Sequence, residues 1–396
     1  MRDVRHRLDE LRRAGLHRRM RTIESSQGPR VVIDGAEVLL LCSNNYLGLA
    51  DHPKVRQAAA TAAERYGAGT GASRLISGTM SIHRKLEEHL AEFKRTEAAL
   101  LFGSGYLANT GTVAALAGRG DVVFSDELNH ASLIDGCRLS RAETFVYRHR
   151  DMEHLEYGLN QVGERAALIV TDGVFSMDGD VAPLIDLIGL ARRYGCRLMV
   201  DEAHGTGALG PGGRGTVAAA GLEGEVDVII GTLGKALGGY GAYVCASAEV
   251  IELLVNVSRP FIFSTAPPPP SVGAALAALS MLDSRPGLVE QLRRNAASLR
   301  QALTSNGLEI GPSRTQIVPV IVGDARRAVA LADRALDGGI FAQAIRPPTV
   351  PEGSSRLRLT VMANHREDEL QRAAKVVARA AIGLGVGIAE PYLRAA

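Results

Sequence analysis

The sequence predicts an α/β protein whose main part is a mostly parallel sheet flanked by helices, followed by a smaller α+β part. From about residue 96, short apolar runs alternate with helical patterns, an order typical of parallel sheets. The runs are almost uninterrupted, as expected of strands that are buried on both faces. A tetraproline, Pro267–Pro270, then breaks the pattern and precedes long helices and a second set of strands.

Five strand-like segments carry the predicted main sheet, and each ends in polar or glycine-rich residues. They are DVVFSD (121–126), ALIVTDGVFS (167–176), CRLMVDEAHG (196–205), VDVIIGTLGK (226–235) and GAYVCAS (241–247). Between them lie amphipathic segments such as APLIDLIGLARRYG (182–195), whose apolar spacing predicts helices. Because ligands of such sheets bind at the carboxyl ends of the strands, the polar ends predict the position of a site.

The remaining segments divide the chain into three predicted parts. Residues 1–43 are expected to form an N-terminal helical and strand segment, 44–283 the large domain and 284–396 a small C-terminal domain. In the first part, RHRLDELRRAGLHRRMR predicts a short amphipathic helix with Leu8, Leu11 and Leu16 on its packing side. SVGAALAALSMLDS predicts the first long helix after the prolines. The last part contains QIVPVIVG, FAQAIRPPTVP and SRLRLTVMANH.

Composition argues against several classes of protein. The 396 residues carry a formal net charge of +2, from 45 basic and 43 acidic residues, which is unlike a nucleic-acid or membrane-surface protein. No segment has the ~20 continuous apolar residues of a membrane-spanning helix, and no secretory signal is recognisable. The four cysteines lie far apart, which is typical of reduced thiols and predicts a cytoplasmic protein.

The stretch GTLGKALGG, residues 231–239, places one lysine, Lys235, among glycines and small residues. Three demands identify a cofactor for this edge of the sheet: an aldehyde needs a lysine, a pyridinium nitrogen needs a carboxylate, and a phosphate needs N–H groups at a helix N-terminus. Lys235, Asp201 and the turn 103–106 supply these groups. Thr232 would help to hold the phosphate and His130 could stack on the ring. The residues therefore predict pyridoxal 5′-phosphate.

Other interpretations of these motifs are weaker. GTLGKA lacks the spacing and the Ser or Thr of a Walker A motif, and without a phosphate loop DEAH does not indicate a helicase. GAGTGAS (67–73) is not the GxGxxG of a dinucleotide site. Asp201 and His204 have no third clustered ligand, so no metal site is predicted.

The motifs together resemble a known family. SNNYLGL, HASL, GVFSMDGD, DEAHGTG and GTLGKALGG are similar, in order and spacing, to those of the α-oxoamine synthases, which are fold-type I pyridoxal phosphate enzymes with the aspartate aminotransferase-like fold. The resemblance extends from about residue 8 to about 385. AIRPPTVPEGSSRLRLTVMANH (344–365) is most similar to the members that join L-alanine to a pimeloyl thioester in biotin biosynthesis, releasing CO2 and the thiol carrier.

The resemblance implies cofactor roles by matched position. Lys235 would form the Schiff base and act as the catalytic base, Asp201 would pair with the pyridine nitrogen and His130 would stack on the ring. His204 and Ser176 would contact the phenolic oxygen of the cofactor. The phosphate would be contacted by Gly105, Tyr106 and Thr232.

Substrate and subunit contacts are also implied. Arg358 would bind the amino-acid carboxylate, Asn44 would lie near it, and Arg18 and Thr349 match other substrate contacts. Ser73 stands where glycine-using members often carry threonine, which would leave room for the methyl group of alanine. Ser264 and Thr265 match a segment that reaches the phosphate of the neighbouring subunit, which implies a homodimer.

Two alternatives remain open at this point. One is a sister enzyme that joins glycine to an acetyl, succinyl or long-chain acyl thioester, as 2-amino-3-ketobutyrate CoA ligase and 5-aminolevulinate synthase do. The other is an inactive scaffold subunit, although such subunits typically lack the lysine that is present here as Lys235. The sequence also leaves the acyl carrier open between coenzyme A and acyl carrier protein.

Overall fold

The computed structural model describes residues 3–387, which form two compact units. The large unit comprises residues 49–176 and 181–289. The small unit comprises the chain up to residue 48, residues 177–180 and the chain from residue 290 on. It thus joins the N-terminal segment to the C-terminal residues, which the sequence treats as separate parts. The predicted domain boundaries stay predictions, and residues 1–2 and 388–396 of the terminal parts lie outside the described residues.

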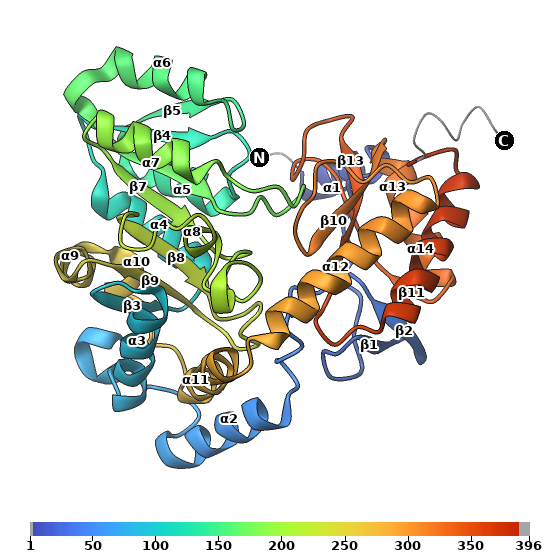
Figure 1. Ribbon diagram of the computed structural model, residues 1–396, viewed down its shortest axis with the longest axis horizontal. Helices are drawn as coiled ribbons and strands as arrows, with labels where there is room; N and C mark the ends of the chain where they lie inside the picture. The colour runs from blue at the N-terminus through green and yellow to red at the C-terminus, as the bar shows by residue number, and fades with distance from the viewer. Residues whose placement is uncertain (1–2, 388–396) are drawn as a thin grey trace. The chain divides into compact units, whose positions relative to one another are not determined.

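A seven-stranded sheet forms the centre of the large unit, in the order β3-β9-β8-β7-β6-β4-β5 (Figure 1). The strands are β3 (Ala98–Phe102), β4 (Val122–Asp126), β5 (Glu143–Tyr147), β6 (Ala166–Asp172), β7 (Arg197–Asp201), β8 (Val228–Thr232) and β9 (Ala242–Ala246). All neighbours pair in parallel except β9, which is antiparallel to both β3 and β8. The prediction of a mostly parallel sheet is therefore confirmed.

Helices flank this sheet. They are α2 (Pro53–Tyr66), α3 (Ser81–Lys94), α4 (Gly105–Leu116), α5 (Ala131–Ser140), α6 (Met152–Val162), α7 (Leu184–Arg193), α8 (Thr216–Ala219), α9 (Ala248–Val257), α10 (Arg259–Ile262) and α11 (Pro269–Ser284). A π-helical turn, η1 (Arg74–Gly78), and short 3₁₀ turns at Gly163–Arg165 and Pro211–Gly213 connect some of them. The predicted helix after the prolines begins at Pro269, because proline is tolerated in a first helical turn.

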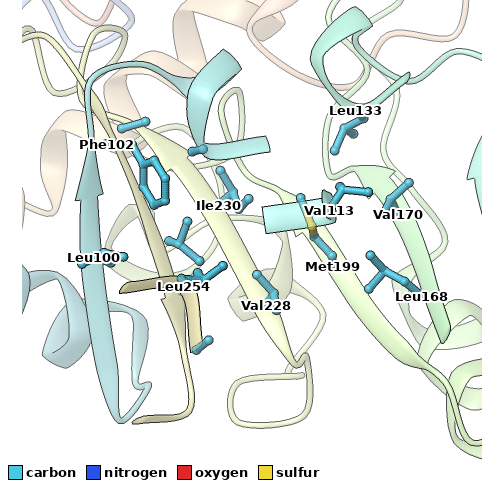
Figure 2. Close-up of a cluster of buried hydrophobic side chains, with 14 of the residues drawn as sticks. Leu100, Phe102, Val113, Leu133, Leu168, Val170, Met199, Val228, Ile230 and Leu254 are labelled. Atoms are coloured by element: carbon cyan, nitrogen blue, oxygen red, sulfur yellow. The ribbon is translucent and has the colours of Figure 1, made fainter. Parts of the chain in front are cut away.

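One hydrophobic core packs α4, α5, α9 and α10 on the sheet (Figure 2). Phe102 and Leu100 of β3, Ile230 of β8, Met199 of β7 and Val113 of α4 belong to this core, and Val113 lies beside Met199 in Figure 2. All of them are 2% exposed or less. Burial of a large apolar side chain contributes about 1.5–3 kcal/mol, so this core fixes the sheet on which the polar strand ends are carried.

The small unit contains two three-stranded sheets. One has the order β1 (Arg30–Ile33), β2 (Ala36–Leu40), β11 (Ile340–Phe341), and the other β10 (Ile317–Gly323), β13 (Ser355–Thr360), β12 (Gln343–Ile345). Its helices are α1 (Val4–Arg13), most of α12 (Gly287–Ser305), α13 (Ala325–Asp337) and α14 (Glu367–Ile382).

The N-terminal helix is shorter than predicted. It ends at Arg13, and Gly15 then takes a left-handed conformation with φ of 69°, so Leu16 lies outside the helix. No helix within residues 3–387 is long and apolar enough to cross a membrane. The four cysteines are free.

Candidate active site

Asp201 is the last residue of β7, and two donors fix the direction of its carboxylate. Its Oδ2 accepts a 2.6 Å hydrogen bond from Nδ2 of Asn109, and its Oδ1 accepts one of 2.8 Å from the amide of Ala203. The residue is 4% exposed. The Asp201 carboxylate is thus held in a fixed direction at the carboxyl end of β7.

Lys235 lies in the loop after β8, and its amine reaches the loop after β7. Its Nζ is 2.7 Å from Nε2 of His204. Because β7 and β8 are parallel neighbours, both loops leave the same edge of the sheet. The glycines allow the loop to turn tightly: Gly238 has φ of +63°, and a Cβ there would lie 2.6 Å from the amide nitrogen of Ala50. The glycine at position 238 is therefore required by backbone packing.

His130 precedes α5 and is linked to Asp201 by hydrogen bonds. Its Nδ1 is 2.7 Å from Oγ of Ser132, and Nδ2 of Asn109 donates both to that Oγ, at 2.8 Å, and to Asp201. Loss of hydration lowers the pKa of His130 although the residue as a whole is exposed; Asp201 opposes this shift and Lys235 adds to it. This shift favours the neutral form of the ring.

The N-terminus of α4 is suited to an anion. Ser104 caps it, accepting a 3.3 Å hydrogen bond from the amide of Leu107 on its Oγ. The amides of Gly105 and Tyr106 open the first turn, where N–H groups have no partner within the helix. The Tyr106 hydroxyl donates to Asp135.

Two further predicted phosphate or ring contacts follow strands of the same sheet. Thr232 ends β8, and its Oγ1 accepts a 3.1 Å hydrogen bond from the amide of Gly234 and donates to the carbonyl of Gly241 at 3.2 Å. Ser176 lies shortly after β6 and is half-buried. Both hydroxyls belong to the edge that carries Asp201 and Lys235.

Ser73 and Thr265 form an antiparallel bridge, so two predicted site segments lie side by side. The amide of Ala266 donates to the carbonyl of Ala72 at 3.0 Å beside it. Ser264 is half-buried and Thr265 exposed. Three large apolar side chains of these segments are exposed, namely Leu75 (51%), Ile76 (80%) and Phe263 (70%).

In the small unit, Arg358 contacts Asn44. Oδ1 of Asn44 accepts from Nη1 and Nη2 of Arg358 at 3.4 and 3.3 Å, and the Tyr46 hydroxyl lies 3.5 Å from Nη2. Arg358 is on β13 and 7% exposed. Arg356, two residues earlier, instead forms an ion pair with Asp178. Asp178 follows β6 of the large unit in the sequence. It belongs to the small unit, however, where it pairs with Arg356.

Arg346 connects the surroundings of Arg18 and Thr349. Its Nη1 and Nη2 donate to the carbonyls of Gly15 and His17 at 2.7 and 2.6 Å, and its own carbonyl accepts from the amide of Thr349 at 3.1 Å. Arg18 and Thr349 are exposed. Arg346 thus holds the segment before Arg18 against the RPPTVP loop.

Sequence reasoning missed four residues of these networks: Asn109, Ser132, Asp172 and Arg346. Asp172 had a usable signal, because it ends a strand as Asp201 does and pairs with Asp201 in register. Asn109 and Ser132 lie inside helices, where nothing in the local sequence indicates that they reach a strand end.

The donor set of the large unit fits pyridoxal phosphate. Lys235 offers an amine, Asp201 a buried carboxylate with a fixed direction, and α4 an anion-binding N-terminus. Asn109 supports the carboxylate, and its Oδ1 is buried without a hydrogen-bond partner among the described residues. Residues 3–387 contain no group of three or more His, Cys, Asp or Glu that could hold a metal ion.

Comparison with known proteins gives consistent matches. Residues 36–377 match the family described as aminotransferase class I and II. An 8-amino-7-oxononanoate synthase of Geobacter sulfurreducens is 57% identical over 382 residues, covering 96% of this chain and 98% of that protein. A structure of serine palmitoyltransferase from S. paucimobilis with a bound PLP–myriocin aldimine has a TM-score of 0.92 and 34% identity, covering 96% of this chain and 97% of that chain. A structure of 8-amino-7-oxononanoate synthase from Francisella tularensis has a TM-score of 0.75 and 28% identity, covering 86% and 97%.

Proposed function

The chain belongs to the aminotransferase class I and II family, and we propose that it condenses L-alanine with a pimeloyl thioester to give 8-amino-7-oxononanoate, CO2 and the free thiol carrier. It is a pyridoxal phosphate-dependent acyltransferase, as its close relatives are. The proposal depends on one structural observation: the Lys235 amine contacts His204 at the strand ends where Asp201 lies. The chain is also 57% identical to an 8-amino-7-oxononanoate synthase.

The large unit supplies the cofactor contacts. When bound, pyridoxal phosphate supplies an aldehyde for an amine and a protonated ring that accepts electrons from Cα. Asp201 would pair with the ring nitrogen and keep it protonated. The α4 amides of Gly105 and Tyr106, with Thr232, bind the phosphate. His130 would stack on the ring, and Ser176 and His204 would contact its phenolic oxygen.

Lys235 performs the proton transfers at the alanine Cα. Its amine would hold the aldehyde of the cofactor in the resting enzyme, and as a free base it would take the proton from Cα. His204, 2.7 Å away, orients that amine. After the acyl group has been added and CO2 lost, Lys235 returns a proton to the same carbon.

Five side chains provide the proposed substrate contacts. Arg358 binds the carboxylate of alanine, since a guanidinium matches a carboxylate in charge and shape, and Asn44 orients it. Ser73 leaves space for the alanine methyl group. Arg18 and Thr349 bind the acyl thioester.

A homodimer completes the proposal. Leu75, Ile76 and Phe263 are exposed on the two segments that the bridge between Ser73 and Thr265 holds together, and large exposed apolar side chains are typical of interfaces. A second copy of the chain covers them, and Ser264 and Thr265 then approach the phosphate of that copy.

A second candidate uses another amino acid and acyl thioester. It is favoured by the TM-score of the serine palmitoyltransferase structure, 0.92 against 0.75 for the Francisella enzyme. Sequence identity favours alanine and pimeloyl thioester more strongly, at 57% against 34%. A TM-score measures the similarity of the backbone fold. Sequence identity also includes the side chains that determine which substrates bind.

The test is a substrate panel with the purified holoenzyme. Alanine, glycine and serine are each paired with pimeloyl-CoA, pimeloyl-acyl carrier protein, acetyl-CoA, succinyl-CoA and palmitoyl-CoA, and free thiol and product mass are measured. We expect 8-amino-7-oxononanoate from alanine with a pimeloyl donor, at a kcat/KM well above every other pair. A higher kcat/KM for any other pair would move the function to the second candidate.

A further inference from the structure

Two buried carboxylates end neighbouring strands of the large sheet. Asp172 is the last residue of β6 and pairs in register with Asp201, the last residue of β7. They are 3% and 4% exposed. Paired residues of a parallel sheet direct their side chains to the same face, so both carboxyl groups lie on one side of the sheet.

The two groups have different hydrogen-bond partners. Asp201 accepts from the Asn109 side chain and the Ala203 amide. Asp172 accepts the amide of His130 on its Oδ2, at 2.7 Å. This bond ties the residue that begins the α5 segment to the end of β6.

Asn129 strengthens the same connection. Its Oδ1 accepts from the Asp172 amide at 2.9 Å, and its Nδ2 donates to the carbonyl of Val170 at 2.8 Å. The loop between β4 and α5 is therefore bound to β6 at Val170 and at Asp172, next to His130.

Few positive charges lie near these two carboxyl groups to offset their repulsion. Burial and the charge of Asp201 raise the pKa of Asp172 well above its ordinary value, and Asp126 at the end of β4 acts in the same direction. The His130 amide and the ammonium of Lys235 lower the pKa of Asp172; their effects are smaller than those of burial and Asp201 but larger than that of Asp126. Two anions side by side in a low-dielectric setting repel each other, which favours the protonated form of Asp172.

We propose that Asp172 is a positioning residue in the neutral carboxylic acid form, which fixes the backbone of His130 and leaves Asp201 as the one negative charge of the pair. The roles of Asp201 and His130 toward the cofactor rest on the proposed function. The protonation of Asp172 does not, because it follows from burial and strand register. Asp201 thus provides the negative charge, and Asp172 fixes the position of the His130 backbone.

Asp172→Asn and Asp172→Ala test the proposal, with Asp186→Asn as the matched control at an exposed carboxylate of α7. Asparagine is neutral and keeps an oxygen that can accept from His130, whereas alanine removes it. Because asparagine has nearly the same shape, it also guards against a variant that simply fails to fold.

The first readout is the urea midpoint of the apoprotein between pH 5 and 8. A carboxyl whose pKa is raised in the folded state stabilises that state at low pH, and this contribution is lost as pH rises from the unfolded pKa of about 4 toward the folded one. We expect the midpoint of Asp172→Asn minus that of the wild type to increase with pH from pH 5 upward. A constant difference over this range would mean that Asp172 is charged in the folded protein and would overturn the proposal.

The second readout is a pH titration of the visible absorbance of the holoenzyme. Replacing a neutral acid by a neutral amide leaves the electrostatic field at Lys235 unchanged. The pH midpoint of the absorbance titration of Asp172→Asn should therefore stay within about 0.3 pH units of the wild-type midpoint. A midpoint lowered by one unit or more would show that a negative charge had been removed, and the proposal would be wrong.

The third readout separates positioning from folding. With a condensable substrate pair, Asp172→Ala should lower kcat at least ten-fold and Asp172→Asn should restore most of it. If asparagine is as impaired as alanine, the ionised carboxylate is required and the proposal fails. If no substrate pair reacts with the wild type, the proposed function fails while the first two readouts still decide the state of Asp172.

Discussion

Nζ of Lys235 lies 2.7 Å from Nε2 of His204, although 31 residues separate them in the chain. The two residues follow neighbouring parallel strands, β8 and β7, so the topology of the sheet brings the loops together. A lysine next to an imidazole has a partner that can share or orient its proton. This contact is the clearest chemical feature of the large unit.

Lys235→Ala should abolish the condensation and change the visible absorbance of the bound cofactor. Loss of a general base typically costs ~10²–10⁴ in rate. The proposal also assigns the binding of the cofactor to the same amine, so the loss should reach at least that range. Turnover and an absorbance spectrum measure both effects. Lys54→Ala, at an exposed lysine of α2, is the control and should behave as the wild type. A Lys235→Ala enzyme with near-normal turnover would remove Lys235 from the mechanism.

Ser73→Thr should shift amino-acid preference from alanine toward glycine. The added methyl group would occupy space that the proposal assigns to the methyl group of alanine, and such steric differences are worth ~1–3 kcal/mol. We expect the ratio of kcat/KM for alanine over glycine to fall about ten-fold. Ser77→Thr, an exposed residue of η1, is the matched control. An unchanged ratio would exclude Ser73 from substrate choice.

Arg346→Ala should weaken binding of the acyl thioester. The substitution removes two hydrogen bonds, 2.7 and 2.6 Å long, to the carbonyls of Gly15 and His17, and so releases the segment that carries Arg18. Since charged hydrogen bonds contribute ~1.5–3 kcal/mol, KM for the thioester should rise about ten-fold while kcat changes less. Initial-rate kinetics measure the two separately, with exposed Arg327→Ala as the control. A fall in kcat without a change in KM would contradict this role.

His365 should make the protein sensitive to mild acid. It is 4% exposed, its Nδ1 accepts from the amide of Met362 at 2.9 Å, and burial lowers its pKa to about 4. A lowered folded pKa gives stability that is present above the unfolded pKa of about 6.5 and is lost as pH falls toward the folded value. The loss between pH 7 and pH 5 should be about 2 kcal/mol.

His365→Asn tests this expectation, because asparagine does not titrate and can still accept from the Met362 amide. Urea midpoints at pH 5, 6 and 7 should decline less in the variant than in the wild type. The same replacement at exposed His6 is the control. Equal declines in His365→Asn and the wild type would assign the acid sensitivity to other groups.

Local sequence signals predicted much of the fold because they are repeated along the chain. Apolar runs ending in polar residues identified β4, β6, β7, β8 and β9. The antiparallel direction of β9 was not predicted, since a fully buried strand has the same apolar pattern in either direction. Leu16 was misplaced on a helix because apolar spacing continued past a glycine that ends it.

The sequence by itself determined the residue types that the chemistry requires: a lysine in a glycine-rich loop, and carboxylates and hydroxyls at strand ends. Tertiary structure alone decided which of them meet. Asp172 and Asp201 become neighbours only through the register of β6 and β7, and Asn109 reaches Asp201 only because α4 packs on the sheet. The physical reason is that strand order, register and helix packing set distances between residues far apart in the chain, and no local pattern encodes those distances.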